Sequence, residues 1–433
     1  MKRHQFEGRG MERLYPCPLG GGNGECGLVR LCAVHLQCRF HGGVTMITKF
    51  GSLFAGHVDL DDIGFDGLPV NDRWLSDERL ASVFEKAEAI AKTLDSGGFD
   101  TMWLAEHHFQ REGHECIPNI LMLALHLSHL TERIKFGCGF NITPMWHPLR
   151  LAEDYAMADH MTGGRVIFGI GRGYHTREVE VFDAPLRDNE ANRRLFDEQV
   201  EIIFKALHER AFSHRGEHYT IPPPVPYRGY ELEDLTLVPP PRSRPVECYQ
   251  PIVSANPSSL DKMTRYGIKG MIGGGAAAGG AHDATMMAWQ DALARAGRET
   301  ELGEDLIIGL VFHIAESKQK AIEEARPFYE ENMKMFAPLG FVRGLTEEQI
   351  AATSDPARIH DAGLPTLEEA AESGSWMVGP PEAVIESLAE LQERYPGLQT
   401  VNVGSVVGTP QSVVVEQLQR FSEEVMPAFK GGA

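Results

Sequence analysis

The amino-acid sequence predicts an α/β protein folded as a single (β/α)8 barrel, a TIM barrel, with insertions and a disordered N-terminal extension. Short apolar segments alternate with amphipathic helical segments from residue 46 onward, and eight such pairs can be counted without a long internal repeat. No Gly-x-Gly-x-x-Gly sequence follows the first apolar segment, which disfavours an open doubly wound sheet. Eight successive strand–helix pairs instead favour a closed parallel barrel.

The first four strand–helix pairs precede residue 212. Their strands are short apolar runs bounded by turn residues. Their helices carry apolar side chains at helical spacing, as at Ile203 and Leu207. The Gly97–Gly98 pair ends the first helix as glycines commonly do, and Pro148 suits a first helical turn. We expect strands at 47–55, 99–105, 134–140 and 165–170, and helices at 76–96, 117–130, 148–161 and from about 190.

A proline-rich excursion, 212–251, interrupts this alternation and is expected to form a hairpin and an extended surface segment. The alternation then resumes and continues to the C-terminus. The stretch 336–376 is too long for a simple connector, which favours a lid over the barrel mouth. We expect the remaining strands at 251–255, 268–272, 306–315 and 400–403, and helices at 258–266, 281–296, 317–335, 382–393 and 411–425.

The chain is acidic. Its 433 residues include 41 Lys and Arg against 61 Asp and Glu, so the formal net charge is -20. Such a surface repels nucleic acid and anionic lipid, and the sequence has no apolar run long enough to span a bilayer. We therefore expect neither nucleic acid nor a membrane as a partner, and a phosphate-bearing ligand must be held by a local cluster of donors.

The 7 cysteines favour a reduced, cytoplasmic protein. Cys17, Cys26, Cys32 and Cys38 lie near the N-terminus without the short spacings of structural zinc sites, and the other three are scattered. An odd count without a paired framework is typical of a reducing compartment. We expect no metal site, and we interpret residues 1–45 as a Gly-rich disordered extension before a barrel domain at 46–433.

Glu106, His107 and His108 directly follow the second expected strand. Active sites of (β/α)8 barrels form at the carboxyl ends of the strands, so polar residues at these ends are candidates. A histidine there can act as a general base because its pKa lies near neutrality. Adjacent side chains of a strand point to opposite sides, so only one of the two histidines is expected to face the site. Hydrogen bonds from these residues to neighbouring loops are the alternative.

Candidate cofactor ligands follow the third, fourth and fifth strands. Asn141 can hydrogen-bond a heterocycle or stabilise its own loop. Glycines including Gly171 flank Arg172, which permits close backbone approach and lets the guanidinium bind a phosphate. Asn256 and Ser259 stand where the fifth strand passes into a helix, where such residues are caps or anion ligands.

Several of these motifs resemble those of the bacterial luciferase family of flavin-dependent monooxygenases. The similarity extends over nearly everything from residue 46 to the C-terminus and is strongest over 97–174. The motifs that carry it are Gly98-Phe99-Asp100-Thr101-Met102-Trp103-Leu104-Ala105-Glu106-His107-His108-Phe109, His147–Asp154, Gly163-Gly164-Arg165, Gly169-Ile170-Gly171-Arg172-Gly173, Val378–Glu382 and Val425-Met426-Pro427.

The resemblance implies a monooxygenase that uses reduced FMN and O2 to oxygenate a small, hydrophobic organic substrate. The chain has no obvious nicotinamide-binding domain, so a separate NAD(P)H-dependent flavin reductase is the implied source of reduced FMN. Members of the family commonly pair through helices on the side of the barrel, which implies a homodimer.

The resemblance also assigns roles to residues. His107 matches the catalytic histidine, with Glu106 and His108 as its neighbours. Gly139 and Phe140 match residues that line the isoalloxazine, where the family often has a non-proline cis peptide bond. The expected cofactor-binding residues are Gly139, Phe140, Asn141, Gly171, Arg172, Tyr174, Arg193, Ala255, Asn256 and Ser259.

Within that set, four residues match the site of the FMN phosphate. Arg172 matches one ligand and Arg193, or its neighbour Arg194, a second, while Asn256 and Ser259 match hydroxyl-bearing positions of the family.

Three departures bear on the substrate, and one is the insertion Val58–Trp74 after the first strand, which is longer than in luciferase and is expected to contribute to the substrate site. Gly171 stands where luciferase has a reactive cysteine, and Phe140 replaces a small residue beside the flavin. These differences argue against a long-chain aldehyde substrate and against light emission.

Two other functions are compatible with the same fold. The first is hydride transfer with a deazaflavin cofactor, without oxygen. The second is a non-catalytic flavin-binding protein, against which the retained His107 argues.

Overall fold

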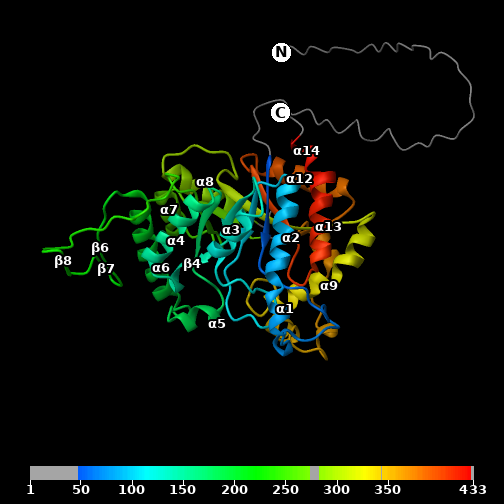
Figure 1. Cartoon of the computed structure of the whole chain (residues 1–433). Helices are drawn as coiled ribbons and strands as arrows, with labels where there is room; N and C mark the ends of the chain where they lie inside the picture. The colour runs from blue at the N-terminus through cyan, green and yellow to red at the C-terminus, as the bar shows by residue number, and fades with distance from the viewer. Residues whose placement is uncertain (1–46, 274–281, 343, 431–433) are drawn as a thin grey trace, which may run out of the picture. The chain divides into compact units, whose positions relative to one another are not determined.

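The computed structural model describes residues 47–273, 282–342 and 344–430 (Figure 1). The predicted disordered extension, 1–45, lies outside the described residues. Within the described part of the chain, no helix is both long and apolar enough to cross a membrane.

The predicted barrel is confirmed. Within the described residues, eight parallel strands follow one another in the order β10-β11-β12-β14-β1-β2-β3-β5, and parallel pairing of β5 with β10 closes the ring. Two further strands, β4 and β13, add to β5 and β12. The bounds are β1 Lys49–Phe54, β2 Thr101–Leu104, β3 Lys135–Cys138, β4 Asn141–Ile142, β5 Val166–Gly171, β10 Cys248–Pro251, β11 Lys269–Ile272, β12 Leu306–Ile314, β13 Trp376–Gly379 and β14 Thr400–Gly404.

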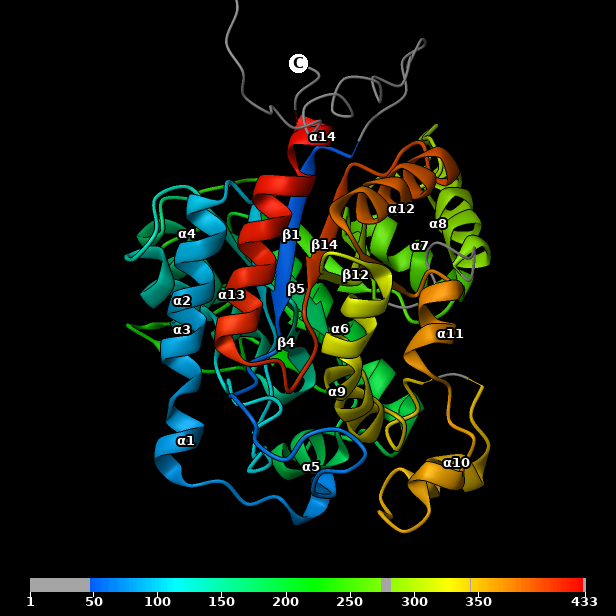
Figure 2. The ribbon, with the colours of Figure 1, turned by 90° about the vertical axis from the view of Figure 1, so that its right-hand side faces the viewer.

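Helices cover the outside of the ring, and Figure 2 shows α9, α12 and α13 beside β1, β12 and β14. Side-chain caps begin several of them: Asn119 accepts the backbone N–H of Met122, and Asp188 caps the sixth helix. The bounds are α1 Asp77–Ala81, α2 Val83–Ser96, α3 Ile120–Ser128, α4 Pro148–Met161, α5 Thr176–Val179, α6 Asn189–His208, α7 Pro257–Tyr266, α8 Asp283–Arg295, α9 Lys318–Phe336, α10 Glu347–Ala352, α11 Leu367–Glu372, α12 Pro381–Arg394, α13 Gln411–Arg420 and α14 Pro427–Lys430.

The fifth strand differs from its prediction at 251–255. It is β10, in which Cys248 and Tyr249 are buried, whereas Val253 is 70% exposed. Pro251 therefore ends the strand instead of opening it. Proline is tolerated at either position because it removes only its own N–H from the ladder, so the residue type alone could not decide.

Two long segments were predicted with different success. The excursion 212–251 contains two antiparallel hairpins, β6 (His214–Arg215) with β7 (Thr220–Ile221) and β8 (Pro226–Tyr227) with β9 (Tyr230–Glu231), as expected of a hairpin-forming segment. The stretch 336–376 was expected to be irregular, but it contains α10 and α11 and leads directly into β13, a strand that the prediction missed.

The core has an outer and an inner part, because alternate strand residues point to the helices and into the ring. Outside, Phe50 packs against Phe421 and Phe429, with ring centroids 5.6 and 6.0 Å apart. Inside, Trp103 meets Tyr249 edge-on at 5.1 Å. The cluster that fills the middle of the ring is Trp103, Ile167, Tyr249, Met271 and Ile307, with Phe140 packed against it.

Glycines occupy inward positions toward the carboxyl ends of β3, β5, β11 and β14, and Gly309 occupies one in the middle of β12. In β5, Phe168 and Ile170 belong to the outer core, so alternation turns Gly169 and Gly171 inward. This part of the mouth of the barrel therefore has fewer large side chains than the middle. The glycines at such positions are Gly139, Gly169, Gly171, Gly273, Gly309 and Gly404.

Gly137→Ala is expected to destabilise the barrel. A Cβ atom at this inward position would lie 2.3 Å from a ring carbon of Trp103, which is itself buried. Overpacking of this kind costs about 1–3 kcal/mol, which should appear as a lower midpoint of urea unfolding. Gly273→Ala is the control, because a Cβ there meets no described atom within 4 Å. An equal loss of stability in both variants would contradict the packing argument.

Candidate functional site

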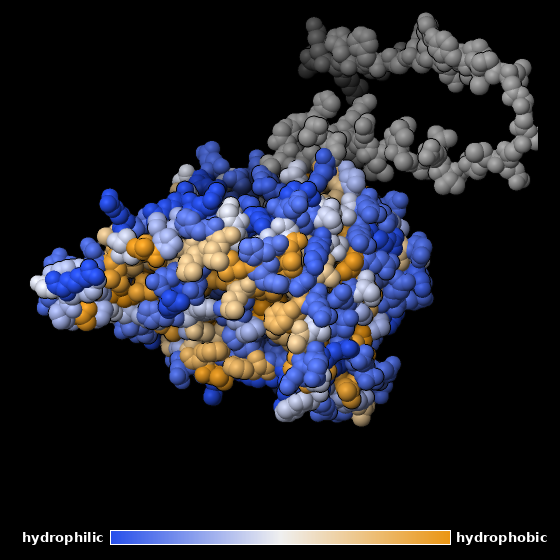
Figure 3. Space-filling model, in the orientation of Figure 1, coloured by the Kyte–Doolittle hydropathy of each residue, from blue (hydrophilic) through white to orange (hydrophobic). Residues whose placement is uncertain are grey.

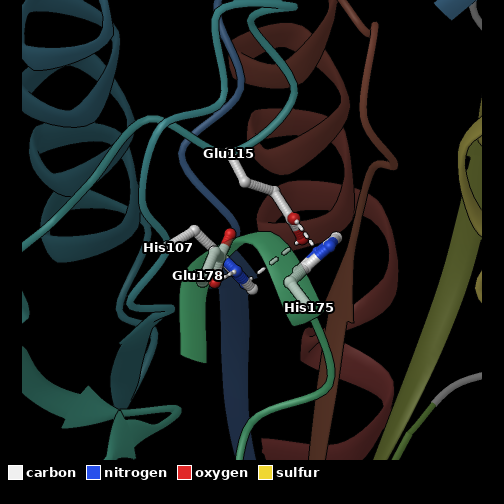
Figure 4. Close-up of side chains that lie close together, drawn as sticks. All are labelled: His107, Glu115, His175 and Glu178. Carbon is white, nitrogen blue, oxygen red and sulfur yellow. Dashed lines mark hydrogen bonds and ion pairs between the residues drawn. The ribbon is translucent and has the colours of Figure 1, made fainter. Parts of the chain in front are cut away.

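Four buried side chains meet at the carboxyl end of the barrel. His107 and Glu115 belong to the loop that follows β2, and His175 and Glu178 lie at the start of α5 (Figure 4). One side-chain donor atom from each residue lies within 4.8 Å of the other three. The first of these residues was predicted as catalytic from the sequence, and the other three were not singled out.

His107 lies between two carboxylates. Its Nδ1 is 3.2 Å from Oε2 of Glu178, and its Nε2 is 3.2 Å from Oε1 of Glu115. The side chain is 5% exposed. Burial by itself lowers the pKa of His107, but the two carboxylates outweigh it, so the pKa is raised above its ordinary value. The arrangement favours an imidazolium that donates a hydrogen bond from each nitrogen.

Tyr174 and His175 also bind the carboxylate of Glu115, at Oε1 and Oε2 respectively. The tyrosine hydroxyl donates to Oε1 of Glu115 at 2.9 Å and lies 3.3 Å from Nε2 of His107. Burial and the adjacent carboxylate raise the pKa of Tyr174 well above its ordinary value, so the hydroxyl keeps its proton. Burial raises the pKa of Glu115, but His107 and His175 outweigh burial and hold that pKa below its ordinary value. Glu115 is therefore ionised although it is buried.

Glu106 and His108 have partners outside this group. The Glu106 carboxylate accepts the backbone N–H of Ile142 at 2.8 Å and the indole N–H of Trp146 at 2.9 Å. His108 lies 3.2 Å from Glu106 and packs against Phe182 at 4.9 Å between ring centroids. Glu106 thus holds the segment after β3 in place, and among the three predicted catalytic residues His107 alone joins the buried group.

Gly139, Phe140, Asn141 and Gly171 lie together at the mouth of the barrel. The Gly139–Phe140 peptide bond is cis, as the resemblance implied. The amide of Asn141 donates to the carbonyl of Gly169 at 2.8 Å, which joins β4 to β5, and its Oδ1 accepts no hydrogen bond from a described residue. A Cβ at Gly171 would lie 3.2 Å from Cβ of Phe140, so a larger residue here would crowd the phenyl ring.

Cationic side chains from three elements surround Asp197. Arg193 of α6 lies 3.0 Å from this carboxylate, and Lys262 of α7 contacts it too. Arg172, at the end of β5, is close enough for Asp197 and Arg193 to influence its pKa, and it donates to Asn189 at 2.7 Å. Arg193 also binds the carboxylate of Glu190, so three cations and two carboxylates form a local basic cluster on an acidic protein.

The predicted residues at the start of α7 lie beside this cluster. Asn256 caps the helix by accepting the backbone N–H groups of Ser258 and Ser259 at 3.0 and 3.3 Å. Ala255, Asn256 and Ser259 are exposed. Arg194 is exposed as well and points to Glu217 at 3.4 Å, so Arg193 is the member of that pair that joins the cluster.

Sequence reasoning missed Glu115, His175, Glu178 and Lys262. The first stands in an irregular loop whose distance from β2 follows no rule of spacing, so nothing in the sequence could have marked it. His175 and Glu178 are three residues apart directly after Tyr174, and this spacing would have been a usable signal, because residues three apart share one face of a helix.

A cavity of about 500 Å³ lies at the opposite end of the barrel. Lys49, Lys135 and Lys269 line it together with Glu247 and Asp305. These residues open their strands, whereas the buried group follows the carboxyl ends of strands, where (β/α)8 enzymes place their chemistry. We therefore place the candidate site at the carboxyl end in spite of the cavity.

The chain belongs to the luciferase-like monooxygenase family. A family model with the description "Luciferase-like monooxygenase" matches residues 64–396, which is well over half of the chain. The family resemblance inferred from the sequence motifs is thereby confirmed.

Relatives at about 30% identity match a short stretch of the chain, and solved structures share the fold. The alkanal monooxygenase alpha chain of the Kryptophanaron alfredi symbiont is 32% identical over 140 residues, 32% of this chain and 38% of the relative. The oxygenating constituent of 3,6-diketocamphane monooxygenase from Pseudomonas putida, solved in complex with FMN, has a TM-score of 0.64 at 20% identity and covers 88% of this chain and 99% of that one. An F420-dependent secondary alcohol dehydrogenase in complex with an F420-acetone adduct has a TM-score of 0.59 at 17% identity, covering 89% and 99%.

The chain spans about two fifths of the length of the curated relatives that it matches at about 30% identity. At 20% identity and below, the solved structures show a shared fold and nothing finer.

Glu178→Gln is expected to lower the pKa of His107. One of the two charges that oppose burial is removed, so burial has more effect. An NMR titration of ¹³C-labelled histidine in the whole protein measures this pKa. Because the folded pKa lies above the ordinary 6.5, the network stabilises the fold below that pH and loses this contribution as pH rises through the folded value.

The matched control for this titration is Glu324→Gln. Glu324 lies 3.1 Å from His313, which is the same kind of pair outside the buried group. This control should lower the pKa of His313 and leave that of His107 in place. A His107 pKa that is unchanged in Glu178→Gln would show that the carboxylate does not set it.

Proposed function

We propose that this chain is a flavin-dependent monooxygenase that uses reduced FMN and O2 to oxygenate a small, apolar organic substrate. The observation that carries the proposal is the buried His107, held between Glu115 and Glu178 at the carboxyl end of a luciferase-like barrel. Two places at the same end of the barrel suit a flavin mononucleotide.

The first place is the basic cluster, which suits the FMN phosphate. Arg172 and Arg193 present guanidinium groups, which bind phosphate oxygens in pairs. Lys262 adds a third positive charge, and the N-terminus of α7 presents backbone N–H groups nearby. This local charge offsets the repulsion that a protein of net charge -20 exerts on an anion.

The second place is the glycine-lined mouth of the barrel, which suits a flat ring system. Side chains at Gly169 or Gly171 would collide with the neighbouring backbone or with Phe140. The Phe140 ring is partly buried against the interior cluster and offers an apolar face. A flavin ring bound here would meet backbone and the face of Phe140.

His107 is the residue proposed to hold and deliver a proton. Reduced FMN, when bound, activates O2 for transfer of one oxygen atom to the substrate. The raised pKa favours the protonated form of His107, and Glu178 fixes the ring through Nδ1. Nε2 faces Tyr174 and Glu115, so the proton at this atom has an acceptor and a second donor within reach.

The residues around the mouth favour an apolar substrate. Leu53 points inward from β1 and is 41% exposed, and Phe341 is 48% exposed. Phe341 also packs edge-on against Tyr174, with centroids 4.7 Å apart, so the segment after α9 reaches the rim of the site. These surfaces have few groups that would bind a strongly polar molecule.

A reductase and a second copy of the chain are the proposed partners. The diketocamphane enzyme is named as an oxygenating constituent, which supports a two-component arrangement with a separate NAD(P)H-dependent flavin reductase. Figure 3 shows hydrophobic residues gathered on the side of α3 and α4. Exposed apolar residues of these two helices and of the neighbouring α2 include Phe84, Met122, Met157 and Met161, a surface suited to pairing of two barrels.

Anaerobic titration with reduced FMN and with reduced F420 tests the cofactor. We expect preferential binding of FMN, and we expect Arg172→Ala to weaken it about 10- to 100-fold, because a charge-assisted hydrogen bond contributes about 1.5–3 kcal/mol. Arg150→Ala, which removes an exposed surface ion pair on α4, is the control and should bind as the parent does. Selective, tight binding of F420 would instead favour hydride transfer with a deazaflavin. The fold shared with the F420-dependent alcohol dehydrogenase is the observation behind this alternative.

His107→Ala is expected to reduce O2-dependent product formation by about 10²- to 10⁴-fold, the usual contribution of a general acid or base. FMN affinity should stay the same, because the imidazole is assigned to proton transfer. The assay screens aldehydes, terpenes, sulfonates and aromatic compounds with reduced FMN and O2. His126→Ala, on the exposed face of α3, is the matched control. Unchanged turnover in His107→Ala would remove this residue from the mechanism. If the parent protein turns over no substrate, a non-catalytic flavin-binding protein is favoured instead.

A further inference from the structure

We propose that His107, Glu115, His175 and Glu178 form a binding site for one divalent transition-metal ion. The proposal goes beyond the flavin chemistry and rests on these four side chains alone. Sequence reasoning expected no metal site, because the cysteine spacings do not suit structural zinc. The two segments that supply the ligands proposed here are far apart in the chain. Figure 4 shows that the fold brings them face to face.

The distances suit a metal ion. One donor atom of each residue lies within 4.8 Å of the others, and Nε2 of His175 is 2.9 Å from Oε2 of Glu115. A zinc ion binds nitrogen and oxygen at about 2.0–2.2 Å, so neighbouring ligands of a tetrahedral site are about 3.3 Å apart. Because Glu178 and Glu115 face different nitrogens of His107, and only one of these nitrogens can bind the ion, the carboxylate at the other nitrogen must rotate toward the ion.

Burial and charge also favour a cation here. All four residues are at most 8% exposed. Two carboxylates stand in the group, and the nearest guanidinium, that of Arg177, is bound by Glu112 at 2.8 and 3.0 Å. A divalent ion would balance both carboxylates at once, whereas one imidazolium balances a single charge.

Outer hydrogen bonds hold the ligands in position. Gln110 donates to Oε1 of Glu178 at 2.8 Å, which leaves Oε2 for an ion, and Tyr174 donates to Oε1 of Glu115 at 2.9 Å. Gln110 is itself fixed by Arg177 through its side-chain oxygen at 2.8 Å. Metal sites in proteins characteristically have such an outer layer, because it orients the ligands and tunes their basicity.

The ligand set selects a class of ion. Two imidazoles with two carboxylates suit zinc, iron(II) and manganese, whereas magnesium and calcium prefer oxygen ligands alone. Among the described residues this is the one group of three or more potential ligands close enough to share an ion. Ligation would use a lone pair of the His107 ring, so metal and proton compete for this residue, and affinity should fall as pH falls.

The test is a zinc titration of the whole protein, freed of metal with a chelator and free of flavin. We expect about one Zn²⁺ per chain by calorimetry and by elemental analysis, and a higher melting temperature in the presence of zinc, since a ligand that binds only the folded state stabilises it. Excess Mg²⁺ should not displace the zinc.

Glu115→Gln and His175→Gln each remove one ligand while keeping a side chain of similar size. We expect each to bind zinc at least about 10-fold more weakly and to lose the zinc-dependent rise in melting temperature. His126→Gln is the matched control, because His126 pairs with Glu88 at 2.8 Å on an exposed helix face. Melting curves without metal verify that the variants fold.

Two results would overturn the site. One is the absence of stoichiometric zinc binding to the parent protein. The other is equal zinc affinity in Glu115→Gln, His175→Gln and the control. Because flavin is absent from these measurements, neither result bears on the proposed monooxygenase activity.

Discussion

The parallel pairing of β5 with β10 is the contact on which the rest of the architecture depends. Phe168 stands opposite Cys248 and Gly169 opposite Tyr249, and this short ladder closes the ring of eight strands. Closure places the end of β5, with Gly171 and Arg172, beside the segment that leads from β10 into α7. The basic cluster and the glycine-lined mouth exist as single surfaces only because the first half of the barrel meets the second there.

The barrel mouth combines two opposite demands. Glycines occupy several of its inward positions, which leaves backbone where a flat ligand can lie. Beside it, ionised groups are buried at close range, and such burial is tolerated only when each charge has partners. The imidazole of His107 pairs with the carboxylates of Glu115 and Glu178. Tyr174 and Gln110 donate further hydrogen bonds to these carboxylates. The site is therefore held rigid before any ligand enters.

The structural features that could be predicted from the sequence are those that depend on neighbouring residues in the chain. Strands, most helices and the cap at Asn256 follow from periodicity and from residue types at helix ends, and the structure agrees with them to within a few residues. The prediction failed at β10 and β13. Pro251 fits either end of a strand, and Trp376–Gly379 lies in a stretch that has no helical or alternating pattern to mark it.

The sequence by itself determined the fold class, the family and the place of His107 after the second strand, because these depend on the order of short patterns along the chain. Only the tertiary structure decided what surrounds that histidine. Glu115 comes from an irregular loop and Glu178 from a short helix that begins after β5, and no local rule relates them. The geometry of a buried charged group depends on chain closure over long separations, which periodicity does not encode.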